Sequence, residues 1–187
     1  VHSKIQSSDR VNAYTKANYY TLRISAEEEI RKKCGGNKCE DITLDEIYAH
    51  MCILGINSLD LDFLKAMEIE TEQKNTVPIL ENIHKVENYV KNGIDTVLIS
   101  DMYLSEKQIR DLLIPYSDVF KQIEIYVSSE YRKTKRTGNL FRIVRRDKKV
   151  AFHEWVHFGD NLVNDVQRPQ ALGIHAEHFD FPVLDKY

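Results

Sequence analysis

The sequence predicts an α/β protein, in which a parallel sheet with helices on both faces follows an all-helical region. Residues from about 10 to 92 have helical character. From residue 96 onward, short apolar runs alternate with helical segments. Alternation of this kind is typical of a parallel sheet that helices cover on both faces.

The helical region contains recognisable helix ends. SAEEEIRKK (25–33) is a strong helix former, and the CGGN that starts at Cys34 interrupts it. In TLDEIYAHMCIL, Thr43 and Glu46 have the spacing of a capping box, with Thr43 as the N-cap. A third helix is expected through LDFLKAMEIETE. These signals predict three helices before Pro78.

A fourth helix is expected to begin at Pro78, because proline favours the first helical turn. Its apolar residues recur at steps of four, three and four, which places them on one helix face. Gly93 suits its C-terminal cap. The apolar positions are Ile79, Ile83, Val86 and Val90.

Short strands are expected in the second half of the chain. TVLIS (96–100) is a continuous apolar run, as found in strands that are buried on both faces. The helix after it, SEKQIRDLL, begins with a capping box of Ser105 and Gln108. Further strands are expected at 123–127, 155–158 and 174–179, with helices at about 138–146 and 162–172.

Composition limits the classes of function. The 187 residues are 42% apolar and 29% charged, which is ordinary for a globular protein. A net charge of −3 gives no indication of binding to nucleic acid or to acidic membranes. No apolar run approaches the length of a membrane span, and the first residues do not resemble a signal peptide. A cytoplasmic location is therefore expected.

The cysteines and histidines favour structural roles over metal binding. Three cysteines, Cys34, Cys39 and Cys52, fit reduced thiols in a cytosolic protein better than a disulfide framework. Zinc binding by these residues and His50 is disfavoured, because the spacing in CGGNKC is poor for it. Strand and surface positions are expected for His153, His157, His175 and His178.

Polar residues follow three of the predicted strands. In open parallel sheets, ligands bind at the carboxyl ends of the strands, so these residues are expected to meet at one edge. A hydroxyl, a lysine and carboxylates that hold a cation such as Mg2+ are suited to handling a phosphoryl group. The residues are Ser100 and Asp101 after the first strand, the basic loop 131–136 after the second, and Asp160, Asn161 and Asp165 after the third.

In order and placement, these motifs resemble the haloacid dehalogenase-like superfamily of phosphohydrolases. Ser100, in TVLISDMYLS, resembles its second motif, a hydrophobic strand ending in Ser or Thr. Lys135, in SSEYRKTKRTGNLF, resembles the third-motif lysine, and GDNLVND resembles the fourth motif, GDxxxxD. ITLDEIY, SDMYLS, YVSSE, TKRTG and HFGDN are similar to a bacterial branch whose members often lie beside glycosyltransferase domains in surface-polysaccharide proteins.

The resemblance implies a Rossmann-like three-layer parallel sheet core at residues 94–187, with an all-helical cap, residues 1–93, inserted between the first and second motifs. It implies Mg2+-dependent hydrolysis of a small phosphorylated metabolite, such as a sugar phosphate, through an aspartyl-phosphate. That substrate and a neighbouring glycosyltransferase domain are the implied partners. In the implied roles, Ser100 binds phosphoryl oxygens, Lys135 stabilises the nucleophile and the transferring group, Asp160 holds Mg2+, Asp165 supports it, and Asp101 and Asn161 line the site.

The family's first motif is not found in the sequence. It is a strand ending in DxDxT, whose first aspartate is the nucleophile. The only DxD, from Asp60 to Asp62, lies between helical segments and is interpreted as a helix cap or a solvated face. Since the first-motif strand is central in the family's sheet, its loss would leave two strands without a ladder partner. The nucleophile is therefore expected upstream of residue 1, or from another segment or chain, and the chain alone is expected to be inactive.

Structural explanations remain open for the site residues. Asp160 and Asn161 could cap the helix that follows them, and Asp165 could be a solvated helix residue. Ser100 and Asp101 could be turn residues. The loop 131–136 offers three other cations, Arg132, Lys133 and Arg136, but the TKRTG pattern favours Lys135 as a compact charge beside a phosphate.

Two other classes of function are considered. A degenerate domain of the same type could serve as a docking module in a polysaccharide-synthesis protein. A receiver-like or nucleotide-binding α/β domain is disfavoured, because no glycine-rich phosphate loop follows TVLIS. An apolar strand ending in DxDxT upstream of Val1 would distinguish the enzyme from the docking module.

Overall fold

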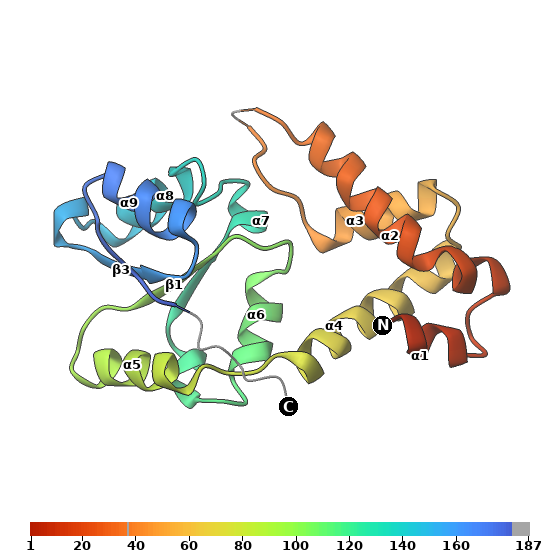
Figure 1. The fold of residues 1–187 in the computed structure, drawn as a ribbon, viewed down its shortest axis with the longest axis horizontal. Helices are drawn as coiled ribbons and strands as arrows, with labels where there is room; N and C mark the ends of the chain where they lie inside the picture. The colour runs from red at the N-terminus through yellow and green to blue at the C-terminus, as the bar shows by residue number, and fades with distance from the viewer. Residues whose placement is uncertain (37, 181–187) are drawn as a thin grey trace.

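The computed structural model describes residues 1–36 and 38–180, and it has a helical part followed by a part that mixes helices and strands (Figure 1). The four expected helices are confirmed, and α2 begins earlier than expected because Asn12 accepts a hydrogen bond from the Thr15 N–H at 2.8 Å. The helices of this part are α1 (His2–Ser7), α2 (Ala13–Lys33), α3 (Leu44–Ile53), η1 (Ser58–Asp60), α4 (Leu61–Asn75) and α5 (Leu80–Lys91).

Both predicted capping boxes are confirmed. At the start of α3, the Thr43 hydroxyl accepts from the Glu46 N–H, and the Glu46 carboxylate accepts from the Thr43 N–H at 2.8 Å. Ser105 and Gln108 make the same pair of bonds at the start of α6. Such caps pair backbone N–H groups that a helix start leaves unpaired, so these helices begin where the sequence predicts.

The second part contains every strand that the sequence predicts. It also shows that the expected helix at 162–172 is a π-helical segment followed by an α-helical turn. In chain order the elements are β1 (Val97–Ser100), α6 (Glu106–Leu113), η2 (Asp118–Lys121), β2 (Glu124–Val127), α7 (Ser128–Tyr131), α8 (Asn139–Lys148), η3 (Phe152–Glu154), β3 (Val156–Gly159), η4 (Leu162–Gln167), α9 (Arg168–Ala171) and β4 (His175–His178).

The strands form two parallel pairs within the described residues. β1 pairs with β2, with Ser100 beside Val127, and β3 pairs with β4, with Gly159 beside His178.

β1 is only half-buried, whereas Ile125–Val127 of β2 is fully buried. The expectation that β1 is buried on both faces is therefore wrong, since one of its edges has no partner strand in the described part of the chain.

Hydrophobic packing joins the two parts of the chain. One cluster contains Ile47 and Leu64 of the helical part together with Leu104 and Val127 of the α/β part. A separate cluster packs Ile83 of α5 against the segment that leads into β2. By packing, α5 therefore lies with the strands that follow it, and α1–α4 form the helical part beside them (Figure 1).

The helices of the described residues do not match a membrane-spanning segment. α2 is 21 residues long, which would reach across a bilayer, but it carries charges such as Glu28 and Arg31 within its length. Across residues 1–36 and 38–180, no helix combines the length and the apolar character that a membrane span requires.

We expect Leu64→Ala to lower the free energy of unfolding by about 2–5 kcal/mol, because it leaves a cavity where a fully buried side chain packs α4 on α3. Leu59→Ala is the matched control, since the Leu59 side chain is 81% exposed and should change stability by less than about 0.5 kcal/mol. Urea denaturation measures both. Equal effects of the two substitutions would contradict this packing.

Candidate functional site

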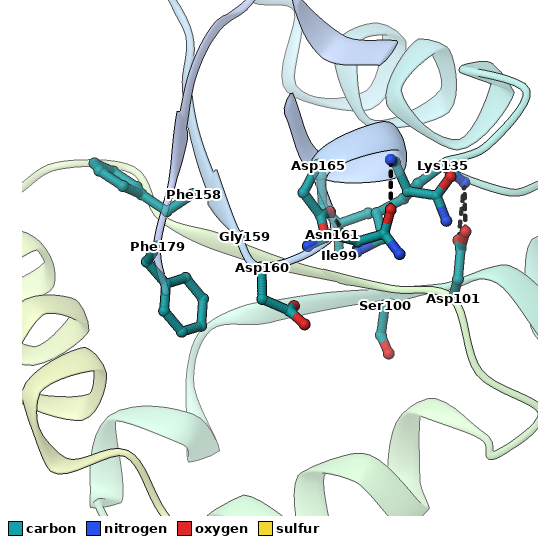
Figure 2. Close-up of a pocket in the computed structure, with 11 residues that line it drawn as sticks. Ile99, Ser100, Asp101, Lys135, Phe158, Gly159, Asp160, Asn161, Asp165 and Phe179 are labelled. Atoms are coloured by element: carbon teal, nitrogen blue, oxygen red, sulfur yellow. Dashed lines mark hydrogen bonds and ion pairs between the residues drawn. The ribbon is translucent and has the colours of Figure 1, made fainter. Parts of the chain in front are cut away.

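The carboxyl ends of β1 and β3 line one pocket of about 460 Å³ (Figure 2). The loop before α8 and the segment after β3 complete its wall. The pocket therefore brings together, from three separated stretches of sequence, every residue that the sequence predicts for the site. They are Ser100, Asp101, Lys135, Asp160, Asn161 and Asp165.

A buried ion pair fixes the Lys135 side chain. Its Nζ donates to Asp165 Oδ1 at 2.6 Å, and His157 Nε2 lies 3.0 Å from the same oxygen. The other carboxylate oxygen accepts from the Asn161 N–H at 3.2 Å. Burial alone would raise the pKa of Asp165, but the His157 hydrogen bond and the Lys135 charge outweigh it and lower the pKa to about 2. Asp165 is thus an ionised carboxylate with both oxygens engaged.

Asp101 fixes the main chain of the same lysine. Its two carboxylate oxygens accept from the Lys135 N–H at 2.8 and 3.1 Å (Figure 2). Burial raises the pKa of Asp101 above its ordinary value. Lys135 is consequently held at both ends, by a carboxylate that follows β1 and by one that follows β3.

Gly159 is required by the close approach of Asp165. A Cβ at this position would lie 2.4 Å from the Asp165 Cβ and Cγ atoms, which is closer than van der Waals contact allows. The π-helical segment η4, which begins at Leu162, carries Asp165 back over the end of β3. The glycine before Asp160 therefore makes room for the ion pair.

His157 lies on β3, as expected, and supports the pocket through Asp165 without lining it, a contact that the sequence did not predict. Side chains alternate between the two faces of a strand, so His157 and Gly159 share the face that Asp165 covers. Phe141 packs against the His157 ring with centroids 5.0 Å apart. The period of two in HFGD, combined with the need for space at Gly159, is the signal that would have identified His157.

Asp160 does not cap the helix after β3, so that interpretation is wrong. Asn161 occupies the cap, and its side chain accepts from the N–H groups of Val163 and Asn164 at 3.1 and 2.9 Å. The Asp160 carboxylate is left exposed in the pocket. Neither this carboxylate nor the Ser100 hydroxyl has a hydrogen-bond partner within the described residues, so both are available to a ligand (Figure 2).

No family model matches this chain, and no curated protein matches it either. The groups that line the pocket are therefore the guide to its function.

The donor set of the pocket is compatible with Mg2+. This ion commonly takes one or two carboxylates, keeps several waters and completes its shell with substrate phosphate oxygens. Asp160 offers a free carboxylate, whereas the oxygens of Asp165 already accept from Lys135, His157 and Asn161. In the described part of the chain, no cluster of three His, Cys, Asp or Glu side chains forms a ready-made metal cage. Water and a phosphate would have to supply the other ligands.

The other basic residues of the loop 131–136 are engaged elsewhere. Arg132 pairs with Glu46, Lys133 pairs with Glu40 at 3.2 Å, and Arg136 lines a neighbouring pocket. Lys135 is the residue of this loop that lines the pocket between β1 and β3. The DxD aspartates lie outside it, with Asp60 at the N-cap position of α4 and Asp62 exposed beside it.

The structure corrects the expectation of reduced thiols for two cysteines. Cys34 and Cys39 form a disulfide, with Cα atoms 5.2 Å apart, and Cys52 is free. The chain turns back after α2 at Gly35 and Gly36, and the positive φ of 103° at Gly36 allows this turn. A zinc site on these two sulfurs, which the spacing in CGGNKC disfavours, would require thiolates, and a disulfide provides none.

We expect Gly159→Ala to lower the free energy of unfolding by about 1–3 kcal/mol, because the added Cβ overlaps Asp165 and strains the ion pair with Lys135. Gly35→Ala is the control, since nothing lies within 4 Å of its added Cβ and it should stay within about 1 kcal/mol of the parent. Chemical denaturation compares them. An unchanged stability for Gly159→Ala would refute the close approach.

Proposed function

We propose that this chain carries most of a Mg2+-dependent phosphohydrolase site of the haloacid dehalogenase-like type, which acts on a small phosphorylated metabolite such as a sugar phosphate. One observation carries the proposal. The free Ser100 hydroxyl at the end of β1, the ion-paired Lys135 after β2 and the free Asp160 carboxylate after β3 line one pocket. Hydroxyl, ammonium and cation-binding groups are what a transferring phosphoryl group requires.

The pairing of the strands supports a Rossmann-like core that needs one more strand. β1 and β3 each have an edge without a partner in the described residues, and their carboxyl ends line the same pocket. A parallel strand between them would join the two pairs into one sheet and would pair their free backbone groups. An aspartate at the end of that strand would lie between Ser100 and Asp160. We propose that a segment upstream of Val1 supplies it.

Each residue of the chain has a defined task in the proposed reaction. The Ser100 hydroxyl donates to a phosphoryl oxygen, and the Lys135 ammonium stabilises both the nucleophilic carboxylate and the charge on the transferring group. Asp101 and Asp165 keep Lys135 in place, and His157 holds Asp165. Mg2+, held by Asp160 when bound, would supply positive charge to the phosphoryl oxygens. The nucleophilic aspartate of the upstream segment would attack phosphorus as the ester P–O bond breaks, and the second aspartate of the DxDxT motif would protonate the leaving alcohol. Water, deprotonated by the same second aspartate, would then hydrolyse the aspartyl-phosphate.

The location and the partner follow from the same proposal. A cytoplasmic enzyme that acts on sugar phosphates would be placed to supply or recycle substrates of a neighbouring glycosyltransferase domain. A docking module without catalysis is the competing function, and it is favoured by one observation. Within the described residues, no aspartate lies between Ser100 and Asp160 on a strand that joins β1 to β3.

Phosphatase assays on the full-length protein with Mg2+, p-nitrophenyl phosphate and a panel of sugar phosphates test the proposal. Turnover is expected, and Asp160→Asn should reduce it by about 10²-fold or more, because the cation loses its carboxylate. Asp62→Asn is the matched control, since that side chain is 98% exposed on α4 and should leave turnover unchanged. Residues 1–187 alone should be inactive.

The opposite results are equally informative. Full turnover in Asp160→Asn would refute the role of this aspartate. A full-length protein that lacks turnover with every phosphate ester, with and without Mg2+, would favour the docking module instead.

A further inference from the structure

A carboxylate of the helical part holds the loop that carries Lys135. Glu40 accepts from the Thr134 N–H at 2.9 Å and from the Thr137 hydroxyl at 2.5 Å. Asn139 Nδ2 donates to it at 2.6 Å, and Lys133 Nζ lies at 3.2 Å. Burial alone would raise the pKa of Glu40, but these hydrogen bonds lower it to about 2. A single carboxylate thus binds the loop on both sides of Lys135.

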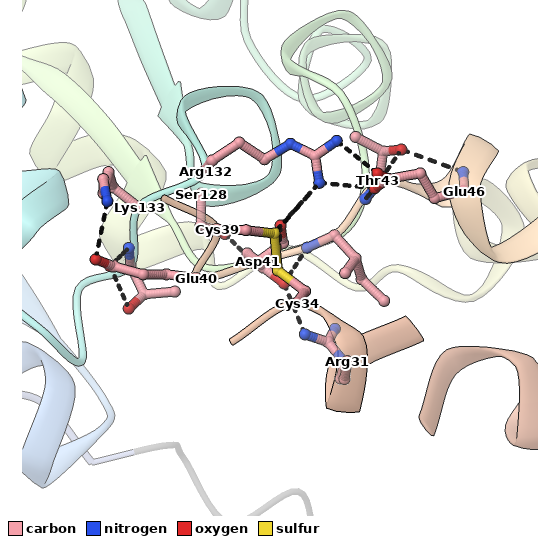
Figure 3. Close-up of a disulfide and its surroundings, with 12 residues drawn as sticks. Arg31, Cys34, Cys39, Glu40, Asp41, Thr43, Glu46, Ser128, Arg132 and Lys133 are labelled. Carbon is pink, nitrogen blue, oxygen red and sulfur yellow. Dashed lines mark hydrogen bonds and ion pairs between the residues drawn. A yellow bond between two sulfur atoms is a disulfide. The ribbon is translucent and has the colours of Figure 1, made fainter. Parts of the chain in front are cut away.

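The next residues of the helical part hold the start of the same loop. The Arg132 guanidinium donates to both carboxylate oxygens of Glu46, each at 2.7 Å, and to the Asp41 carbonyl at 3.0 Å (Figure 3). The buried Asp41 carboxylate accepts from the Ser128 hydroxyl. We refer to Glu40, Asp41 and Glu46 together as the clamp. Its contacts run from Ser128 to Asn139, so the clamp fixes the backbone from which Lys135 projects.

The disulfide ties the clamp to the end of α2. Cys39 directly precedes Glu40 in the chain. Its disulfide partner, Cys34, is the C-cap residue of α2, so the bond joins the neighbour of Glu40 to the end of that helix (Figure 3). Arg31, in the last turn of α2, also pairs with Asp41 at 2.6 Å. The disulfide therefore holds Glu40 close to the end of α2. Without the disulfide, the ion pair between Arg31 and Asp41 would still connect α2 to the clamp.

The disulfide is accessible to a reductant. Both cysteines line a second pocket of about 640 Å³. Asp101 lines this pocket and also the pocket between β1 and β3. Both are partly exposed, and the flanking Gly35 and Lys38 are exposed. A disulfide that a thiolate can approach is the kind that exchanges readily. Where a cytosolic protein does form a disulfide, that bond is usually transient, catalytic or redox-sensing.

We propose that the Cys34–Cys39 disulfide is a redox-sensitive control on Lys135, and that Glu40 is the positioning residue through which it acts. The inference rests on the proposed function for its effect on catalysis, but the placement of the loop can be measured without turnover. Oxidised protein has the clamp closed and Lys135 aligned with Asp165. Reduced protein has a loosened clamp, in which Glu40 no longer holds Thr134 and Thr137 on the two sides of Lys135.

The reduction balances with a dithiol as the electron donor. A thiolate of the dithiol attacks one cysteine sulfur, the Cys34–Cys39 bond breaks, and the released cysteine thiolate takes a proton. The second thiolate of the dithiol then attacks the mixed disulfide, releases the other cysteine and forms the oxidised dithiol. Two electrons and two protons move from the dithiol to the protein, which then carries two thiols.

Amide hydrogen exchange of the chain before and after reduction with dithiothreitol tests the proposal. Mass spectrometry would establish the redox state of both cysteines. Reduction should speed exchange in residues 133–139 by about 10-fold or more, because the Thr134 N–H donates to Glu40, and the Thr137 hydroxyl that Glu40 holds accepts from the Asn139 N–H. Exchange around Val144, fully buried in α8, should not change, which excludes general unfolding as the cause.

Substitutions separate the clamp from other effects of the reductant. Glu40→Gln should speed exchange in 133–139 even in oxidised protein, whereas Glu28→Gln, exposed on α2, should not. Cys34→Ser with Cys39→Ser should behave as reduced protein and should no longer respond to dithiothreitol. Cys52→Ser should respond as the parent does, because Cys52 is free.

Turnover of the full-length protein then separates the two proposals. Reduction and Glu40→Gln should each lower kcat by about 10-fold or more and change KM little, because Lys135 acts on the transferring group. Absence of turnover in both redox states would overturn the proposed function. The exchange measurement would still test whether the disulfide controls the loop that carries Lys135. Two free thiols with unchanged exchange in 133–139, or unchanged kcat in an active enzyme, would overturn the redox control.

Discussion

The ion pair between Lys135 and Asp165 is the interaction on which the arrangement of the pocket depends. A buried charge pair costs desolvation energy unless further hydrogen bonds complete it, and here His157 and the Asn161 N–H engage the remaining capacity of the carboxylate. The pair joins the loop after β2 to the segment after β3. Gly159 leaves the space that the pair occupies, so the glycine, the π-helical turn and the lysine loop form one unit.

This unit divides the polar groups of the pocket into two kinds. Asp101 and Asp165 are engaged with Lys135 and serve to place it, whereas Ser100 and Asp160 have no protein partner in the described part of the chain. The free groups are available to a ligand, and the engaged carboxylates determine the position of the Lys135 ammonium in the pocket. The helical part adds a second layer of control, because Glu40 holds the lysine loop from outside the pocket.

The sequence predicted the elements that local signals determine. Thr43 with Glu46 and Ser105 with Gln108 located two helix starts, and short apolar runs located the strands, since caps and periodicity act over a few residues. The residues of the pocket were predicted because parallel strands bring their carboxyl ends together. The disulfide was missed because a low, odd cysteine count favours reduced thiols, although its two residues are only five apart. The contact of His157 with Asp165 was missed because it depends on the path of η4. The role of Asn161 as the cap likewise required the path of η4.

The most direct measurement is a crystal structure of the full-length protein with Mg2+ and orthovanadate, a mimic of the transferring phosphoryl group. Vanadate is expected within hydrogen-bond reach of Ser100 Oγ and Lys135 Nζ, with Mg2+ on Asp160. An additional parallel strand, hydrogen-bonded to both β1 and β3, is expected to end in an aspartate beside the vanadate. Vanadate bound elsewhere, or β1 and β3 paired directly with each other, would contradict the proposed site.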